Sequence, residues 1–282
     1  MAAVAAAAVV TIALAGGSDD KPQPPFVASA GPAPATLWAV GDSADGGPRA
    51  ARIANLIGHD PGQRLLYLGD VYERGTADEW EHHYEPTYGR FAAVTAPTPG
   101  NHEWYLRDDG YRPYWERKKG RDVPDYYDFN IAGWQVLALN SEHELELEPG
   151  SDQQKWLRSR LGAPGNCRLA FWHRARFSAG SHHDDPRLDT LWQPLRGKAA
   201  VVVNAHDHNM QRLEPQDGTA IYIAGAGGHS NYDLNEEDPR LEFANDEDDG
   251  ALRIVLRPGK ADLSFVAANG RVLDKSTVNC TR

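Results

Sequence analysis

The sequence predicts an α/β fold in which a mixed β-sheet, or two packed sheets, is flanked by helices. Three observations support this prediction. Strand and helix signals alternate from residue 36 onward, several apolar runs end abruptly at Asp or His, and residues 251–273 have the pattern of an antiparallel meander. The chain has 282 residues, of which 41% are hydrophobic, so it can bury a substantial core.

The first predicted elements follow the order strand, helix, strand, helix. Residues 36–42 and 64–70 are short apolar runs typical of buried strands. Between them, residues 48–59 have apolar side chains at helical spacing, with Pro48 suited to a first helical turn. Residues 76–91 begin with a threonine cap and an acidic first turn, and they predict a second helix.

The second half of the chain continues with strands and one further helix. Residues 126–140 predict two strands joined at Ala132 and Gly133. Residues 151–162 predict a helix that begins with a Ser-x-x-Gln capping box and ends at a glycine. Three more apolar runs predict strands, at residues 167–173, 199–208 and 219–228.

Two polar segments are predicted to be exposed loops. Residues 105–121 mix aromatic residues with Arg and Lys, and they could alternatively bind an organic phosphate. Residues 232–249 carry nine acidic residues and one Arg, so a solvated loop is favoured over a cation site or a lid.

The N-terminal region is predicted to lie outside the folded domain. Residues 2–15 are uncharged and apolar, too short to span a bilayer as a helix, and similar to the hydrophobic part of an export signal. We therefore expect an export signal at residues 1–15, a Pro/Gly-rich linker at residues 16–35 and one folded domain at residues 36–282. The mature protein is expected to be secreted, periplasmic or on the cell surface, without a stable membrane span.

Cysteine content and charge add two expectations. In an exported protein, an even number of cysteines predicts a disulfide, here between Cys167 and Cys280, with two unrelated thiols as the alternative. The net charge of −11 argues against nucleic acid as a partner, because phosphate backbones are bound by Lys and Arg. It does not exclude small phosphorylated substrates, because bound metal ions can reverse the local field.

Five separate segments each place Asp, Asn or His just after an apolar run. In an open α/β sheet, ligands bind in the crevice beyond the carboxyl ends of the strands. Carboxylates, an amide oxygen and imidazoles suit Zn, Mn or Fe, and the absence of Cys argues against a closed structural zinc site. So many donors suit two ions that share a bridging carboxylate. The residues in these positions are Asp42, Asp70, Asn101, His102, His173, His206 and His208.

These segments resemble a known family. In chain order, the sequence contains GDS at 41–43, GDVY at 69–72, GNHE at 100–103, FWH at 171–173 and AHDH at 205–208. They are similar to the five blocks of the calcineurin-like metallophosphoesterases, and most similar to the purple acid phosphatase branch. The resemblance covers roughly residues 38–228 and implies a four-layer sandwich, two mixed β-sheets flanked by helices.

The resemblance also implies roles for the donor residues. Asp70 would bridge two metal ions, namely Fe with Zn, Mn or Fe, and a metal-bound hydroxide would be the nucleophile. Asp42 and His208 would hold the first ion, and Asn101, His173 and His206 would hold the second.

Further residues are implied to contact the substrate. His102 would protonate the leaving oxygen rather than bind metal. A histidine about ten residues beyond His173 contacts the phosphate in the family, which here implies His182 or His183, with His183 favoured. Arg174 could contact a phosphate oxygen or be an ordinary surface residue.

The first ion needs another donor in this chain. Diesterase branches use a His in the first block, where this chain has Ala44, and purple acid phosphatases use a Tyr three residues after the bridging Asp. Here that position is Glu73, and Tyr72 falls one residue early. We favour Tyr72 as the ligand, with Glu73 or water as alternatives.

Together these observations predict an exported, metal-dependent hydrolase of small phosphate esters, with phosphomonoesters favoured. A phosphodiesterase or nucleotide hydrolase on the same scaffold is the nearest alternative. A non-catalytic metal-binding module is a more distant one, because such proteins typically lose the acid and one or more ligands, and this chain retains them all. No oligomeric state follows from the sequence.

Overall fold

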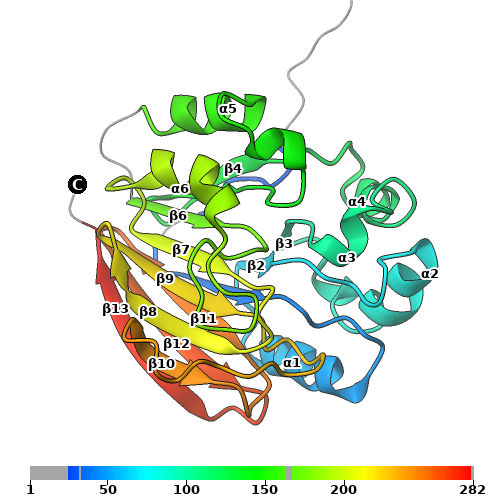
Figure 1. Cartoon of the computed structure of the whole chain (residues 1–282). Coiled ribbons are helices and arrows are strands. Elements are labelled where there is room, and N and C mark those ends of the chain that lie inside the picture. Colours follow the sequence, from blue (N-terminus) through cyan, green and yellow to red (C-terminus); the bar gives the residue numbers. More distant parts are fainter. Residues whose placement is uncertain (1–24, 32, 163–166, 281–282) are drawn as a thin grey trace, which may run out of the picture.

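The computed structural model describes residues 25–31, 33–162 and 167–280. Two mixed β-sheets pack face to face, and helices cover the outer face of each sheet (Figure 1). The predicted export signal and about half of the predicted linker, residues 16–24 and 32, lie outside the described residues. Within the described ranges, no helix has the length and apolar character needed to cross a membrane.

The first sheet has six strands in the order β13-β12-β11-β1-β2-β3. The three strands β1, β2 and β3 are parallel, and β11, β12 and β13 extend the sheet with antiparallel pairing. The strands are β1 (Ala35–Val40), β2 (Arg64–Tyr67), β3 (Thr95–Pro97), β11 (Gly250–Arg257), β12 (Lys260–Ala267) and β13 (Val272–Asn279).

The second sheet has seven strands in the order β10-β8-β9-β7-β6-β5-β4. Strands β5, β6, β7 and β9 are parallel, and the remaining strands pair in antiparallel fashion at the edges. The strands are β4 (Tyr127–Ile131), β5 (Trp134–Ala138), β6 (Cys167–Phe171), β7 (Val201–Asn204), β8 (Met210–Gln216), β9 (Thr219–Ala224) and β10 (Leu241–Asn245).

Helices form the two outer layers. Helix α1 starts at a proline, as predicted, and buries an apolar stripe against the first sheet. Helix α5 starts after Ser151, whose hydroxyl accepts a hydrogen bond from the backbone N–H of Gln154. The helices are α1 (Pro48–His59), α2 (Ala77–Glu79), α3 (Asn101–Trp104), α4 (Tyr111–Lys119), α5 (Asp152–Arg160) and α6 (Asp189–Leu195).

Three apolar clusters separate the four layers. The largest lies between the two sheets and includes Leu66, Phe171 and Phe265. A second lies between the first sheet and α1 and α4, and a third lies between the second sheet and α5 and α6. The predicted four-layer sandwich, with two mixed sheets flanked by helices, is therefore confirmed.

The predicted disulfide is also present. Cys167, the first residue of β6, is bonded to Cys280, just after β13. The bond joins the second sheet to the last strand of the first sheet, across the inter-sheet core.

Three segments differ from the prediction. The helix expected over 76–91 is short: α2 continues as a π-helical turn over Trp80–Tyr84, and a 3₁₀ turn follows at Gly89–Phe91. Pro86 explains the interruption, because it lacks an N–H and clashes with the preceding turn. The expected loop 105–121 contains α4, and the expected loop 232–249 contains the edge strand β10, which pairs with β8.

Candidate metal centre

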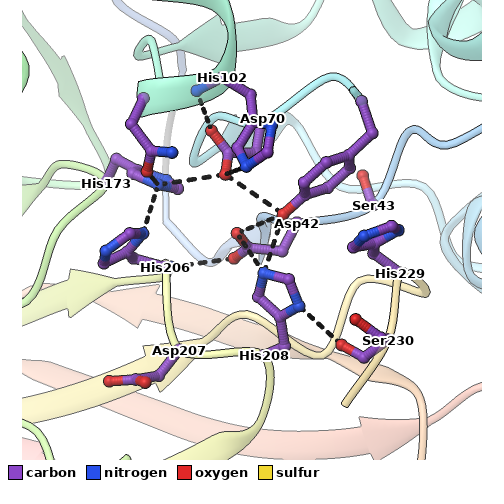
Figure 2. Close-up of polar contacts among 12 residues, drawn as sticks. Asp42, Ser43, Asp70, His102, His173, His206, Asp207, His208, His229 and Ser230 are labelled. Carbon is purple, nitrogen blue, oxygen red and sulfur yellow. Dashed lines mark hydrogen bonds and ion pairs between the residues drawn. The ribbon is translucent and has the colours of Figure 1, made fainter. Parts of the chain in front are cut away.

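The predicted donors lie together where parallel strands of both sheets end. Asp42 follows β1, Asp70 follows β2, and Asn101 begins α3 just after β3. His173 follows β6, and the segment after β7 carries His206 and His208. Figure 2 shows Asp42, Asp70, His173, His206 and His208 pointing toward one another. Each side chain is less than a tenth exposed, apart from Asn101.

One group of donors surrounds the Nε2 atom of His173. This atom lies 3.0 Å from Oδ1 of Asn101, 3.2 Å from Nδ1 of His206 and 3.4 Å from Oδ2 of Asp70. The ligand atoms of Asp70, His173 and His206 all lie within 4.8 Å of one another. A carboxylate, an amide oxygen and two imidazoles therefore face a common point, as ligands of a single ion do.

A second group of donors surrounds the hydroxyl of Tyr72. This oxygen lies 2.9 Å from Nε2 of His208, 3.1 Å from Oδ1 of Asp42 and 3.2 Å from Oδ2 of Asp70. The side chain of Glu73, in contrast, is 71% exposed, and its Oε1 atom lies 4.0 Å from Nε2 of His229. The structure thus brings Tyr72, and not Glu73, into the cluster.

Asp70 belongs to both groups. The same oxygen, Oδ2, contacts His173 on one side and the Tyr72 hydroxyl on the other. Its second oxygen accepts a hydrogen bond from the backbone N–H of His102. This is the arrangement required of a carboxylate that bridges two ions.

Three of the donor residues have an uncommon, left-handed backbone conformation, which sets the direction of their side chains. Asp42, Asp70 and His206 have φ angles of 56°, 68° and 72°. Non-glycine residues in this left-handed region are costly, and they concentrate at functional sites. In each case the chain turns sharply at the end of a strand, so the side chain projects into the space between the two sheets' edges.

The buried carboxylates of Asp42 and Asp70 repel each other when no cation lies between them. Burial and the charge of Asp70 raise the pKa of Asp42 well above its usual value. Burial acts on Asp70 in the same direction, but His173 and His102 outweigh it and leave the pKa of Asp70 below its usual value. A bound cation would remove this repulsion, because it would be attracted to both carboxylates.

Burial favours the neutral forms of His206, His208 and Tyr72. Burial lowers the pKa of His208 to about 4, and burial also lowers the pKa of His206. Burial, together with Asp42 and Asp70, raises the pKa of Tyr72 well above its usual value. Neutral imidazole is the form that binds metal, so these histidines are ready to serve as ligands over a wide pH range.

Glu103 and Gly100 support the position of Asp70. The buried carboxylate of Glu103 accepts hydrogen bonds from the backbone N–H groups of Asp70 and Val71, at 3.0 Å and 3.2 Å. A side chain at Gly100 would collide with Asp70, because an added Cβ would lie 2.0 Å from its Oδ1 atom. Contacts of this kind orient metal ligands in other proteins.

His102 lies beside the cluster rather than in it. Its Nδ1 atom lies 2.5 Å from the backbone carbonyl oxygen of Glu73, so Nδ1–H donates to that carbonyl. Its Nε2 atom faces Asp70 at 3.8 Å, and the side chain is 30% exposed. The ring is therefore held by one nitrogen, and the other remains available to a bound molecule.

The structure distinguishes the two neighbouring histidines after β6. The ring of His182 stacks on His206 with centroids 3.8 Å apart, and its Nδ1 lies 3.0 Å from Oδ1 of Asp207. His183, exposed like His182, lines the same cavity, which has a volume of about 260 Å³. Asp207 holds both the ring and the backbone N–H of His182 against the donor cluster, whereas the contact of His183 with phosphate stays a prediction.

Arg174 also reaches the cluster. Its Nη1 atom lies 2.8 Å from Nε2 of His206, and its Nε–H donates to the buried carboxylate of Glu142 at 2.9 Å. Arg174 is therefore held in place at the cavity wall and is not a loose surface residue.

Sequence reasoning missed several residues around the donors. Asp207 points away from the centre in Figure 2 and holds His182, and its position between two predicted ligands was a usable signal. Glu142, which anchors Arg174, follows β5 with no signal in the sequence. Tyr232, also missed, stacks on His208 with ring centroids 3.8 Å apart. On the other side of the cluster, the ring of His229 stacks on Tyr72 with centroids 3.9 Å apart.

The residues present fit a pair of metal ions. Two carboxylates, one amide, three imidazoles and one phenol converge in two groups that share Asp70. The cluster lies at the carboxyl ends of strands from both sheets of a four-layer sandwich. The fold and the arrangement of the donors are those of the metallophosphoesterase class.

Comparisons with known proteins agree with this class. A family model described as calcineurin-like phosphoesterase matches residues 35–210, more than half of the chain. The chain therefore belongs to the calcineurin-like phosphoesterase family. It is also 26% identical over 157 residues to the tartrate-resistant acid phosphatase type 5 of Oryctolagus cuniculus, a match that covers 50% of this chain and 46% of that protein. The chain thus matches less than half the length of this relative.

Several solved structures share the fold. GAP50, the anchor in the inner membrane complex of Plasmodium, has a TM-score of 0.72 at 15% identity, over 88% of this chain and 90% of that chain. A purple acid phosphatase from seeds of yellow lupin, Lupinus luteus, has a TM-score of 0.69 at 16% identity, over 89% and 54%. A dimetal phosphatase from Danio rerio has a TM-score of 0.60 at 13% identity, over 91% and 100%.

Proposed function

We propose that this protein hydrolyses phosphomonoesters of small molecules at a centre of two metal ions. The position of Asp70 carries the proposal, because one carboxylate oxygen contacts both groups of donors. In this proposal Asp42, Tyr72 and His208 hold the first ion with Asp70. Asn101, His173 and His206 hold the second ion with Asp70.

We further propose iron in the first position and Zn, Mn or Fe in the second. A phenol, carboxylates and imidazoles, with no thiolate, suit these ions. When bound, the two ions supply Lewis acidity to the phosphoryl group and lower the pKa of water.

The remaining residues are proposed to bind the substrate and move a proton. His102 protonates the leaving oxygen from its Nε2 atom, because its Nδ1 is engaged by the carbonyl of Glu73. Arg174 and His182 bind phosphate oxygens on the opposite side, where their cavity opens. His183 lines the same cavity, where it can contact a bound ester.

Export remains part of the proposal. The disulfide between Cys167 and Cys280 supports it, because such bonds persist mainly in oxidising compartments. The relative from Oryctolagus cuniculus is an acid phosphatase by name, which supports the monoester preference. GAP50 is described as an anchor, but at 15% identity its likeness concerns the fold alone.

Alanine substitutions test the proposed roles. Asn101→Ala and His206→Ala should each abolish phosphate release and lower the metal content, because each removes a proposed ligand. His102→Ala should lower turnover by about 10²- to 10⁴-fold with metal content unchanged, since it removes only the acid. His82→Ala is the matched control, because its side chain is 70% exposed and lies outside the cluster. Full activity in His206→Ala would contradict the assignment.

A further inference from the structure

A separate cavity opens beside His102. It has a volume of about 330 Å³ and is lined by Glu73, Arg74, Asn101, His102, Tyr105 and Leu106. It differs from the cavity of Arg174 and His182, with which it shares no lining residue. Because His102 and the proposed ligand Asn101 form part of its wall, the cavity borders the proposed centre. Its size is at the lower end of the range for small-molecule sites, about 300–1,000 Å³.

Tyr105 stands exposed at this cavity. Its side chain is 84% exposed, the highest value among the large hydrophobic residues that are exposed. The adjacent Trp104 is only 8% exposed, and the guanidinium of Arg107 covers its ring at 4.4 Å. Within the part of the chain that the structure describes, the ring of Tyr105 packs on no other ring or cation, and its hydroxyl makes no hydrogen bond. An unpartnered aromatic ring beside the proposed acid is a platform for another flat ring.

Arg74 supplies an unpaired cation to the same cavity. Its backbone N–H donates to Glu79, which holds the loop in place, but its guanidinium makes no hydrogen bond or ion pair among the described residues. The arginines of the other cavity are different, because Arg174 pairs with Glu142 and Arg187 pairs with Asp185. Arg74 is therefore free to bind polar or anionic atoms of a ligand.

We propose that this cavity is the leaving-group subsite and that the preferred leaving group carries an aromatic ring that stacks on Tyr105. The inference rests on the proposed function, because His102 marks the side of the phosphorus from which the alcohol departs. Arg74 then contacts polar atoms attached to that ring or to its linker. A nucleoside and an aryl alcohol share this chemistry, so phosphate esters of either class are the preferred substrates.

Two substrates that differ only in the ring test the inference. Adenosine 5′-monophosphate and ribose 5-phosphate share the sugar and the ester, but only the first carries a base. Alanine substitution at a base-stacking platform lowers affinity by about 5- to 150-fold. Tyr105→Ala should therefore lower kcat/KM for adenosine 5′-monophosphate by about tenfold, and that for ribose 5-phosphate by less than about twofold. Tyr105→Phe should retain the preference, because it keeps the ring.

A second pair separates the two sources of the ring. Phenyl phosphate and glycerol 2-phosphate also differ in whether the leaving group is aromatic. For each pair, the kcat/KM of the ring-bearing ester is divided by that of the ring-free ester, in wild type and in Tyr105→Ala. If the substitution lowers this ratio in both pairs, the subsite recognises any aromatic ring. Dependence in the first pair alone indicates a nucleoside, and dependence in the second pair alone indicates an aryl alcohol. Calorimetric binding of adenosine or phenol, with Tyr105→Ala for comparison, measures the same contact without turnover.

Leu145→Ala is the control, because Leu145 is also strongly exposed, at 75%, but lies outside the cavity. It should leave all four kcat/KM values unchanged. If Tyr105→Ala affects ring-bearing and ring-free esters alike, or neither, the subsite is wrong and the proposed function stands. If the metal-loaded protein hydrolyses none of the four esters, the proposed function fails, and the subsite fails with it.

Discussion

The carboxylate of Asp70 has little freedom, because the backbone of Gly100 lies directly against it. An added Cβ at Gly100 would lie 2.0 Å from Oδ1 of Asp70, closer than any real contact, although the φ angle of −103° is open to other residues. The need for glycine here is therefore steric. This contact connects one strand-end segment, residues 100–103, with another, residues 69–72.

Gly100→Ala should displace Asp70 and weaken metal binding by about 10- to 100-fold, the range seen when groups that orient ligands are changed. Metal affinity can be measured by titration of the chelated protein. Gly31→Ala is the control, because nothing lies within 4 Å of an added Cβ there. Equal affinities for the two variants would show that Asp70 does not depend on Gly100.

Sequence and structure agree most closely on the residues at strand ends. Each predicted strand is an apolar run, and the residue after it must lie at the carboxyl end of that strand. This places Asp42, Asp70, His173 and His206 at the strand ends from the sequence alone. Tyr72 was harder, because it lies in a turn, and spacing alone does not determine which way a turn residue points.

Whether His182 or His183 contacts the phosphate stays a prediction, and the sequence is a weak guide to this choice for a related reason. Neighbouring residues in a loop point in different directions, and the deciding contact comes from Asp207, 25 residues away in sequence. His183 has a φ angle of 58° and turns outward. No local pattern in the sequence contains that information.

At the scale of elements, the short helix α2 organises the segment after Asp70. The carboxylate of Glu79 accepts backbone hydrogen bonds from Glu73 at 2.6 Å, Arg74 at 3.1 Å and Thr76 at 2.8 Å. The hydroxyl of Thr76 accepts from the N–H of Glu79 and completes a capping box. The cap therefore holds in place the loop that carries both Tyr72 and Arg74.

Glu79→Gln should lower the free energy of unfolding by about 1 kcal/mol at pH 7. Burial acts to raise the pKa of Glu79, but hydrogen bonds from Thr76, Glu73 and Arg74 outweigh it and lower the pKa. A lowered pKa in the folded state means that the stabilisation is present above the usual value of 4.5 and is lost as pH falls through the folded-state pKa.

Thermal unfolding at pH 7 and at pH 3 checks this prediction. The difference in Tm between wild type and Glu79→Gln should be largest at pH 7 and should shrink at pH 3. Glu237→Gln is the control, because Glu237 is exposed and should show no difference at either pH. A difference for Glu79→Gln that does not change with pH would contradict a role for its charge.

Long, strongly periodic elements were predictable, and short ones were not. Helix α1 has the predicted bounds, because its apolar stripe and its proline both mark it. Strand β3 has three residues and α3 has four, too few to show a period. Strand β10 lies in an acidic segment, where pairing with β8 overrides the polar composition.

At the scale of the molecule, the disulfide joins segments that are distant in sequence. Cys167 and Cys280 are separated by 113 residues, and the bond ties β6 to the end of β13. In the chain-entropy model, a cross-link over about 100 residues stabilises a fold by about 4.7 kcal/mol.

Replacing both cysteines by alanine should therefore lower the free energy of unfolding by about 3–5 kcal/mol. Urea unfolding of the variant and of the oxidised wild type gives this difference. Wild type treated with a reductant is the comparison, and it should behave like the variant. An unchanged urea midpoint would show that the bond does not stabilise the fold.

The metal centre also depends on the whole molecule, because its donors come from both sheets. Asp42, Asp70 and Asn101 follow strands of the first sheet, whereas His173, His206 and His208 follow strands of the second. Packing of the two sheets across the inter-sheet core therefore sets the distance between the donor groups.

Metal titration of the chelated protein, with phosphate release from ribose 5-phosphate followed at each step, tests the central claim most directly. Two ions bridged by Asp70 should both be needed for the reaction. We expect no release without metal and full activity only when two ions per chain are bound. Full activity after chelation, or a plateau at one ion per chain, would contradict the account.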